Sequence, residues 1–189
     1  MFASLIAAVL LATAPGPLEV VKSGNTELQT AAKAPGATVE QLSQVVERFV
    51  DFQELSKRAL GTTWAKLTPA QRQELSSAME GLLRASYAQK AISQGKVLAK
   101  VQYGEQTVVG KEARVNTTLI VGGDKIPVNY KLHQQKGTWR IYDVITDDVS
   151  LLDTYKEQFG KLLQEKGFDG LLATLKAKKE QLEKGGGAK

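Results

Sequence analysis

The sequence contains no cysteine, and its 189 residues include a single histidine, His133. Without cysteine the chain forms no disulfide and offers no thiolate as a nucleophile or a metal ligand. A zinc site would rest almost entirely on carboxylates, which zinc disfavours. Serine–histidine–aspartate catalysis would have to use His133, and no nucleophile-elbow motif accompanies that residue. We therefore expect no catalytic set and no metal site.

The chain also lacks the run of ~20 apolar residues that a membrane-spanning helix needs. Its N-terminus carries only a short apolar run, residues 5–11, which is followed by Ala12-Thr13-Ala14. A short apolar run before a small-x-small sequence is typical of a cleaved signal peptide, which we place at residues 1–14. The alternative is a retained N-terminal helix, because no Lys or Arg precedes the run and Pro15 follows the cleavage point.

The composition is that of an ordinary globular chain, with 42% hydrophobic and 24% charged residues and a formal net charge of +5. A mildly basic chain suits an anionic membrane surface, an acidic partner or nucleic acid, so the net charge alone does not distinguish these three partners. We expect no nucleic-acid partner, because the positive charge is scattered except at the lysine-rich end. Residues 15–36 are interpreted as a linker or loosely docked segment, 37–182 as the folded domain and 183–189 as a flexible tail.

Apolar residues recur at helical spacing between residues 39 and 60. Within this stretch Asp51 can cap a new helix, with Glu54 three residues on as its partner in a capping box. Gly61 then suits the left-handed residue that ends a helix. The pattern predicts two helices that meet at a bend at Asp51.

A longer helix is predicted from Thr68 to about Gln94. Thr68 suits the N-cap and Pro69 suits the first helical position. Gly81, in the middle of this helix, costs about 1 kcal/mol relative to alanine. A glycine at such a place indicates the close approach of another element.

Beyond Gly95 the apolar residues alternate with polar ones, which is the period of a strand. The predicted strands are residues 97–103, 115–121, 126–132 and 139–145. Two further helices follow, one beginning at Ser150 and one after the break at residues 166–170. Four antiparallel strands with one apolar face need helices to cover that face, so the predicted fold class is α+β.

Few polar residues in the region of the predicted strands are candidates for catalysis or metal binding. His133 lies on the polar side of its strand beside a turn, and we expect it to be a solvated surface residue. Asp143, Asp147 and Asp148 cluster near the end of the last strand, but the twelve-residue calcium loop is absent. Turn formation and helix capping are their predicted roles. Burial of Asp143 in a pocket, with a raised pKa, would instead favour an enzyme.

The last strand and the helices after it resemble one known family. Trp139-x-x-Tyr142-Asp143-Val144 is followed by Val149-Ser150-Leu151, by Tyr155 and Phe159, and by Gly167-Phe168-Asp169-Gly170-Leu171. Upstream, the matching residues are Asp51-Phe52, Leu60-Gly61, Trp64, Thr68-Pro69-Ala70-Gln71-Arg72 and Tyr87. In their order and spacing these motifs, which cover about residues 39–182, resemble the MlaC or toluene-tolerance auxiliary family of periplasmic phospholipid-binding proteins.

The resemblance implies a fold and a function. The fold would be NTF2-like or cone-shaped, with a four-stranded antiparallel sheet covered by helices around an apolar cavity. The function would be periplasmic lipid transport after export, with phospholipid as cargo and no cofactor. The implied partners are an outer-membrane lipoprotein complex and an inner-membrane ABC transporter with an MCE-domain subunit, a system that maintains the lipid asymmetry of the outer membrane.

In such a carrier the inward strand positions and the stripe of the long helix would line the cavity. The predicted lipid-binding residues are Phe52, Met79, Leu82, Leu83, Tyr87, Val101, Tyr103, Val115, Leu119, Val128 and Tyr130. One alternative is an NTF2-like small-molecule enzyme of the isomerase or dehydratase type, which would need an acid or base inside the cavity. Another is a protein-interaction module whose own side chains fill the apolar face.

Overall fold

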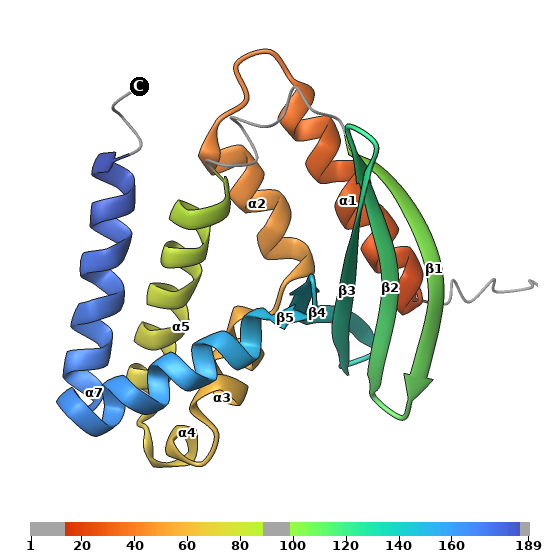
Figure 1. Ribbon diagram of the computed structural model, residues 1–189. Helices are drawn as coiled ribbons and strands as arrows, with labels where there is room; N and C mark the ends of the chain where they lie inside the picture. Colours follow the sequence, from red (N-terminus) through yellow and green to blue (C-terminus); the bar gives the residue numbers. More distant parts are fainter. Residues whose placement is uncertain (1–13, 89–98, 186–189) are drawn as a thin grey trace, which may run out of the picture.

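A computed structural model of the chain describes residues 14–88 and 99–185. A curved antiparallel sheet lies at one side of the molecule, and helices α3, α4, α5 and α7 pack together at the other side (Figure 1). Helices α1 and α2 lie between the sheet and that helical group. None of the helices in the described ranges is long and apolar enough to cross a bilayer.

The sheet has five strands in sequential order, each antiparallel to the next. The strands are β1 (Lys100–Val109), β2 (Glu112–Val121), β3 (Asp124–Gln135), β4 (Thr138–Thr146) and β5 (Val149–Ser150). The α+β class and the antiparallel sheet are therefore confirmed. The prediction of four strands was wrong by one, because β5 has two residues and no alternation that a sequence pattern could reveal.

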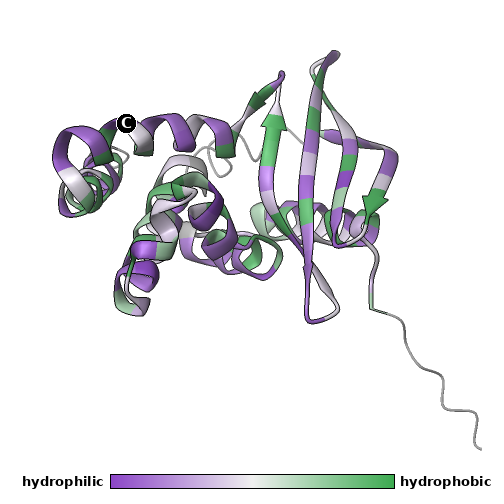
Figure 2. Ribbon diagram, turned by 90° about the horizontal axis from the view of Figure 1, so that it is seen from below, coloured by the Kyte–Doolittle hydropathy of each residue, from purple (hydrophilic) through white to green (hydrophobic). Residues whose placement is uncertain are grey.

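The pairing register places the predicted apolar positions on one face of the sheet. Val115 pairs with Tyr130, and Leu119 pairs with both Val101 and Ile126. Since neighbours along a strand point to opposite faces, directly paired residues share a face. Apolar and polar residues alternate visibly along the strands in Figure 2.

Helix α1 (Pro17–Lys33) covers part of that apolar face, contacting β1, β2 and β4. Its Val20 and Val21 belong to the same buried cluster as Val115, Leu132 and Ile141 of the sheet. Residues Pro17–Lys33 therefore form a packed helix and not a linker or a loosely docked segment, and Pro17 suits its first position. Its burial depends on contacts with the sheet, which the sequence pattern does not show.

The bend predicted at Asp51 separates α2 (Val39–Phe49) from α3 (Phe52–Leu60). The Asp51 carboxylate accepts a hydrogen bond from the backbone N–H of Glu54 at 2.9 Å. The Asp51 backbone N–H donates to the carbonyl of Ile141 on β4 at 2.7 Å. The bend is thus tied to the sheet as well as capped.

The remaining helices form a second core. They are α4 (Thr63–Lys66), α5 (Pro69–Leu83), the π-helical turn η1 (Arg84–Ala88) and α7 (Leu151–Gly185). The α5 helix begins at the predicted N-cap, Thr68, which forms a reciprocal capping box with Gln71. Residues 89–94 of the predicted long helix lie outside the described residues. The predicted break inside α7 is a kink at Gly167, where φ is 67°.

Replacing Gly81 of α5 and Gly24 of α1 by alanine should have different effects on stability. A methyl group at Gly81 would lie 3.1 Å from Cδ of Lys179, the flexible side chain of α7 that approaches α5 there. A methyl group at Gly24 would lie 3.1 Å from the ring of Phe49, which is packed against the sheet-side core. We expect Gly81→Ala to raise the free energy of unfolding by up to about 1 kcal/mol, through helix propensity. Gly24→Ala should gain nothing or lose stability, and urea denaturation of both variants measures the difference.

Candidate functional site

The predicted lipid-binding residues do not converge on one site. Seven of them divide between two apolar clusters, one on the sheet and one among the helices, and Val101, Leu119 and Val128 belong to neither cluster. The side chain of Tyr87 lies outside the described part of the chain.

The strand candidates share the apolar face of the sheet. Val115 and Val128 are buried, whereas Val101, Tyr103, Leu119 and Tyr130 are only partly buried. Helix α1 packs on this face around Val115. The sheet therefore presents a surface that is closed at one part and retains partly accessible apolar side chains at another.

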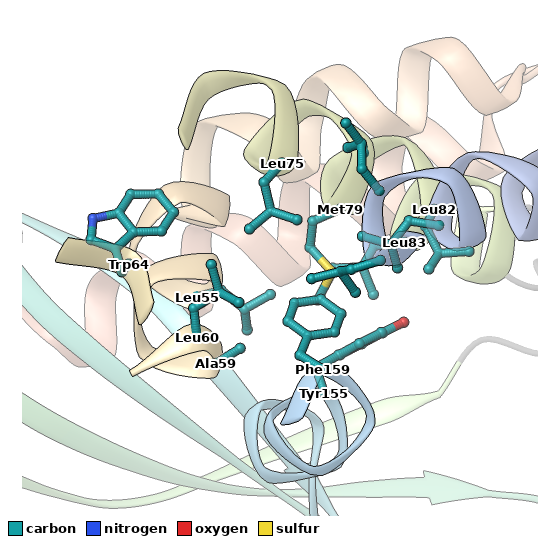
Figure 3. Close-up of a cluster of buried hydrophobic side chains, with 14 of the residues drawn as sticks. Leu55, Ala59, Leu60, Trp64, Leu75, Met79, Leu82, Leu83, Tyr155 and Phe159 are labelled. Carbon is teal, nitrogen blue, oxygen red and sulfur yellow. The ribbon is translucent and has the colours of Figure 1, made fainter. Parts of the chain in front are cut away.

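The helix candidates belong to the core of the helical group. Met79 is 0% exposed, and it packs with Leu82 and Leu83 of α5 against Phe159 and Tyr155 of α7 (Figure 3). Phe52 is partly buried at the edge of the same cluster. A residue with nearly all of its surface in contact with its own chain is a packing residue, so Met79, Leu82 and Leu83 belong to the helical core and not to the sheet face.

A small polar group lies within the apolar face of the sheet. The Tyr130 hydroxyl donates to Oδ1 of Asn25 on α1 at 3.5 Å, and Nζ of Lys22 lies 5.9 Å from the centre of the Tyr103 ring. Burial raises the pKa of Tyr130, so its hydroxyl remains a neutral donor. Nδ2 of Asn25 is buried and has no hydrogen-bond partner among the described residues. The face therefore offers a free donor beside its apolar side chains.

His133 is not the solvated residue that the alternation predicts. It is 8% exposed, and its Nε2 lies 3.0 Å from Oδ2 of Asp51. The Tyr142 ring meets it edge-on, with ring centres 6.0 Å apart. The polar side of β3 is covered here by the start of α3, so the histidine joins the sheet to the bend between α2 and α3.

Neighbouring titratable groups also hold elements together. The Arg58 guanidinium stacks 3.8 Å from the centre of the Tyr142 ring and bonds Glu112 of β2 at 2.6 Å. Burial raises the pKa of Tyr142 to about 12. On the other side of the helical group, burial and the nearby charge of Glu47 raise the pKa of Glu80.

Asp143 is buried at 1% exposure, but its oxygens are occupied. Oδ1 accepts from the backbone N–H of Leu152 at 2.9 Å, and Oδ2 accepts from Ser150 Oγ at 2.8 Å. Nζ of Lys131 completes the set, 3.0 Å from Oδ2. The predicted capping role is confirmed for Asp143. Asp147 and Asp148 form the turn before β5, with φ of 48° and 62°.

Two further features bear on ligand chemistry. Within residues 14–88 and 99–185, no group of three or more His, Asp or Glu residues is arranged to hold a metal ion. A shallow, open hollow of about 490 Å³ lies on β1 and β2. Its lining residues are Gln102, Tyr103, Gly104, Asn116, Thr117 and Thr118. This hollow has a mixed polar and apolar lining, and none of its lining residues belongs to the helical core.

Sequence reasoning missed α1 as a wall of the sheet-side cluster. The signal was present, because Leu18, Val21, Asn25 and Leu28 recur at helical spacing. Asn25 interrupts the apolar stripe, which hides it from a purely hydrophobic pattern. The same interruption places the free amide donor on the sheet face.

Comparisons with known proteins agree on one family. The family model described as MlaC protein matches residues 18–177. The chain is 28% identical over 175 residues to the toluene tolerance protein ttg2D of Pseudomonas putida, covering 85% of this chain and 79% of that protein. It also matches the solved structure of a phospholipid-binding protein from Ralstonia solanacearum, in complex with a phospholipid, with a TM-score of 0.80. That match covers 89% of this chain and 99% of the other at 23% identity, which shows a shared fold.

Proposed function

Because this chain belongs to the MlaC family, we propose that it is a phospholipid carrier that shelters acyl chains against the apolar face of its sheet. The supporting observation is the uneven cover of that face. Val115 is buried in the cluster that α1 forms with the sheet, while Val101 and Leu119 on the same face remain partly accessible. Bound acyl chains would cover the apolar side chains of the sheet that α1 leaves partly accessible.

The energetics of such a carrier constrain the site. Exposing a lipid with about thirty methylenes to water costs roughly 20 kcal/mol, at ~0.8 kcal/mol per methylene. An apolar face must offset nearly all of this cost but little more, since the lipid also has to leave. Directional transfer then requires partners that bias loading or release.

The proposal extends to location and partners. We propose that residues 1–14 direct export and that the mature chain works in the periplasm. It would move phospholipid between an outer-membrane lipoprotein complex and an inner-membrane ABC transporter with an MCE-domain subunit, contributing to outer-membrane lipid asymmetry. The chain would act as a carrier, with no catalytic residue and no cofactor.

Lipid analysis of the purified full chain tests the function directly. We expect phospholipid to co-purify with it and to appear as bound mass in native mass spectrometry. Delipidated protein should regain lipid when incubated with phospholipid vesicles. Protein that carries no lipid and takes none from vesicles would refute the carrier proposal.

A pair of adjacent substitutions tests the position of the site. Leu119 lies on the apolar face, and Ile120 points to the opposite face, paired with Lys100 and Lys125. We expect Leu119→Gln to weaken phospholipid binding roughly tenfold, because it removes about 1.5 kcal/mol of apolar burial. Ile120→Gln should leave binding unchanged. Equal effects, measured by lipid transfer from vesicles, would place the site elsewhere.

A further inference from the structure

The first strand of the sheet has a free edge. β1 lies at one edge of the sheet in the order β1-β2-β3-β4-β5, and no strand in the described ranges pairs with its outer side. Eight of its ten residues are exposed. A free edge presents a row of backbone N–H and C=O groups that another extended chain can bond.

The hairpin geometry identifies which backbone groups are free. Val109 and Glu112 pair across the two-residue turn Gly110-Lys111, so they form a hydrogen-bonded pair. Pairs alternate along an antiparallel ladder, so Thr107 also bonds β2, while Gln106 and Val108 direct their N–H and C=O groups outward. The outward groups of these two residues are the docking points of the edge.

The last four residues of β1, Gln106 to Val109, lack the charge and proline that usually protect an edge strand. Natural edge strands are blunted by charge, proline or bulges. The segment Gln106-Thr107-Val108-Val109 has no charge and no proline, and the register shift of β1 ends before it at Gln106. Val108 is 47% exposed and Val109 is 73% exposed, two of the three exposed large hydrophobic residues in the described chain.

The open hollow borders β1 at Gln102, Tyr103 and Gly104, just before this part of the edge. A methyl group at Gly104 would lie 3.3 Å from the carbonyl oxygen of Asn116, so the missing side chain leaves that part of β2 open. Lys100 and Arg114 are exposed on the same face as Gln102 and Asn116, and neither forms an ion pair within the described residues. Glu105 is the one carboxylate on β1 itself. The surroundings of the hollow therefore favour a negative side chain.

We propose that β1 is a docking edge for an extended, acidic segment of a partner protein, which adds to the sheet as a further strand. Backbone hydrogen bonds to Gln106 and Val108 would supply the affinity. An acidic side chain reaching across Gly104 toward Asn116 would supply the specificity, as alternate side chains do in strand addition. Because only the four residues from Gln106 to Val109 form the docking edge, we expect the partner to bind transiently.

A second copy of this chain fits the edge less well. Two copies joined along four residues would bury far less than the roughly 1,200 Å² of a specific stable interface. Each copy would also bring its own cations, Lys100 and Arg114, to the shared edge, where like charges repel. The partner segment goes beyond the proposed carrier function and does not depend on where the lipid lies.

Peptides of defined sequence test the proposal on the isotope-labelled full chain. The probe is the acetylated and amidated peptide TVEVTV, with TVKVTV as its matched control. We expect TVEVTV at millimolar concentration to slow amide exchange at Gln106 and Val108. TVKVTV should bind roughly tenfold more weakly, as a charge reversal near two cations implies. No protection by either peptide, or equal protection by both, would overturn the proposal.

Two variants separate edge pairing from charge. Val108→Pro removes the outward N–H, which proline tolerates on an edge strand, while Val108→Thr keeps it. The proline variant should lose peptide binding but keep its lipid content and unfolding midpoint. Arg114→Glu should reverse the peptide preference, a readout that remains if the proline variant fails to fold. Protection that rises with protein concentration without peptide would identify a second copy as the occupant and refute a partner segment.

Discussion

Val21→Asp should lower the free energy of unfolding by about 3–5 kcal/mol, because it buries a carboxylate without a partner. Val21 is 1% exposed, within the cluster that α1 forms with Val115, Leu132 and Ile141 of the sheet. Ser23 stands two residues along the same helix and is exposed. Ser23→Asp adds the same charge at the surface, where a change within about 0.5 kcal/mol is expected.

Urea denaturation of the two full-length variants compares them on equal terms. A large loss at position 21 alone would show that α1 is part of the sheet-side core in solution. Equal, small losses would mean that residues 15–36 behave as the loosely docked segment that the sequence suggests. Since α1 covers the proposed lipid face, Val21→Asp should also lower the lipid content of protein that remains folded.

The helices and strands that sequence patterns predicted well are those with local signals. Thr68 is the N-cap of α5 as predicted, and its hydroxyl accepts a hydrogen bond from the backbone N–H of Gln71. The alternation along β2 and β3 places Val115 and Tyr130 as direct partners on one face. Such signals depend on a few neighbouring residues, and the physics that produces them is equally local.

The arrangement of the candidate site could not be predicted in the same way. An apolar stripe indicates that a residue is buried, but it does not say against what. Met79 and Val115 are both fully buried, yet they belong to separate clusters. Which stripes meet depends on contacts between residues far apart in the chain, and these become visible only when the elements are placed in space.

His133 shows a second limit of the alternating pattern. The pattern assigns it correctly to the face opposite the apolar one, since it pairs with Glu112 and Arg140. It does not say whether solvent or another element covers that face. Here the start of α3 covers it, and Asp51 serves both as helix cap and as the histidine's partner.

Asp143→Ala should lower the free energy of unfolding by about 3–5 kcal/mol, the cost of leaving a buried charge network with one partner removed. The change leaves the N–H of Leu152 and the hydroxyl of Ser150 without their acceptor, and it leaves Lys131 without its counter-charge. Asp143→Asn keeps the volume and one carbonyl acceptor, so we expect a loss of about 1–2 kcal/mol.

Asp153, exposed in the first turn of α7, provides the control. Asp153→Ala removes a carboxylate from the same helix end, where an exposed charge contributes about 0.3–1 kcal/mol. Urea denaturation of the three variants measures their free energies of unfolding. We expect the loss of the buried carboxylate at position 143 to cost more than the loss of the exposed one at position 153. If Asp143→Ala costs no more than Asp153→Ala, Asp143 does not hold β4 to α7. The buried carboxylate would then be free for another role, and an acid–base function in this fold would have to be reconsidered.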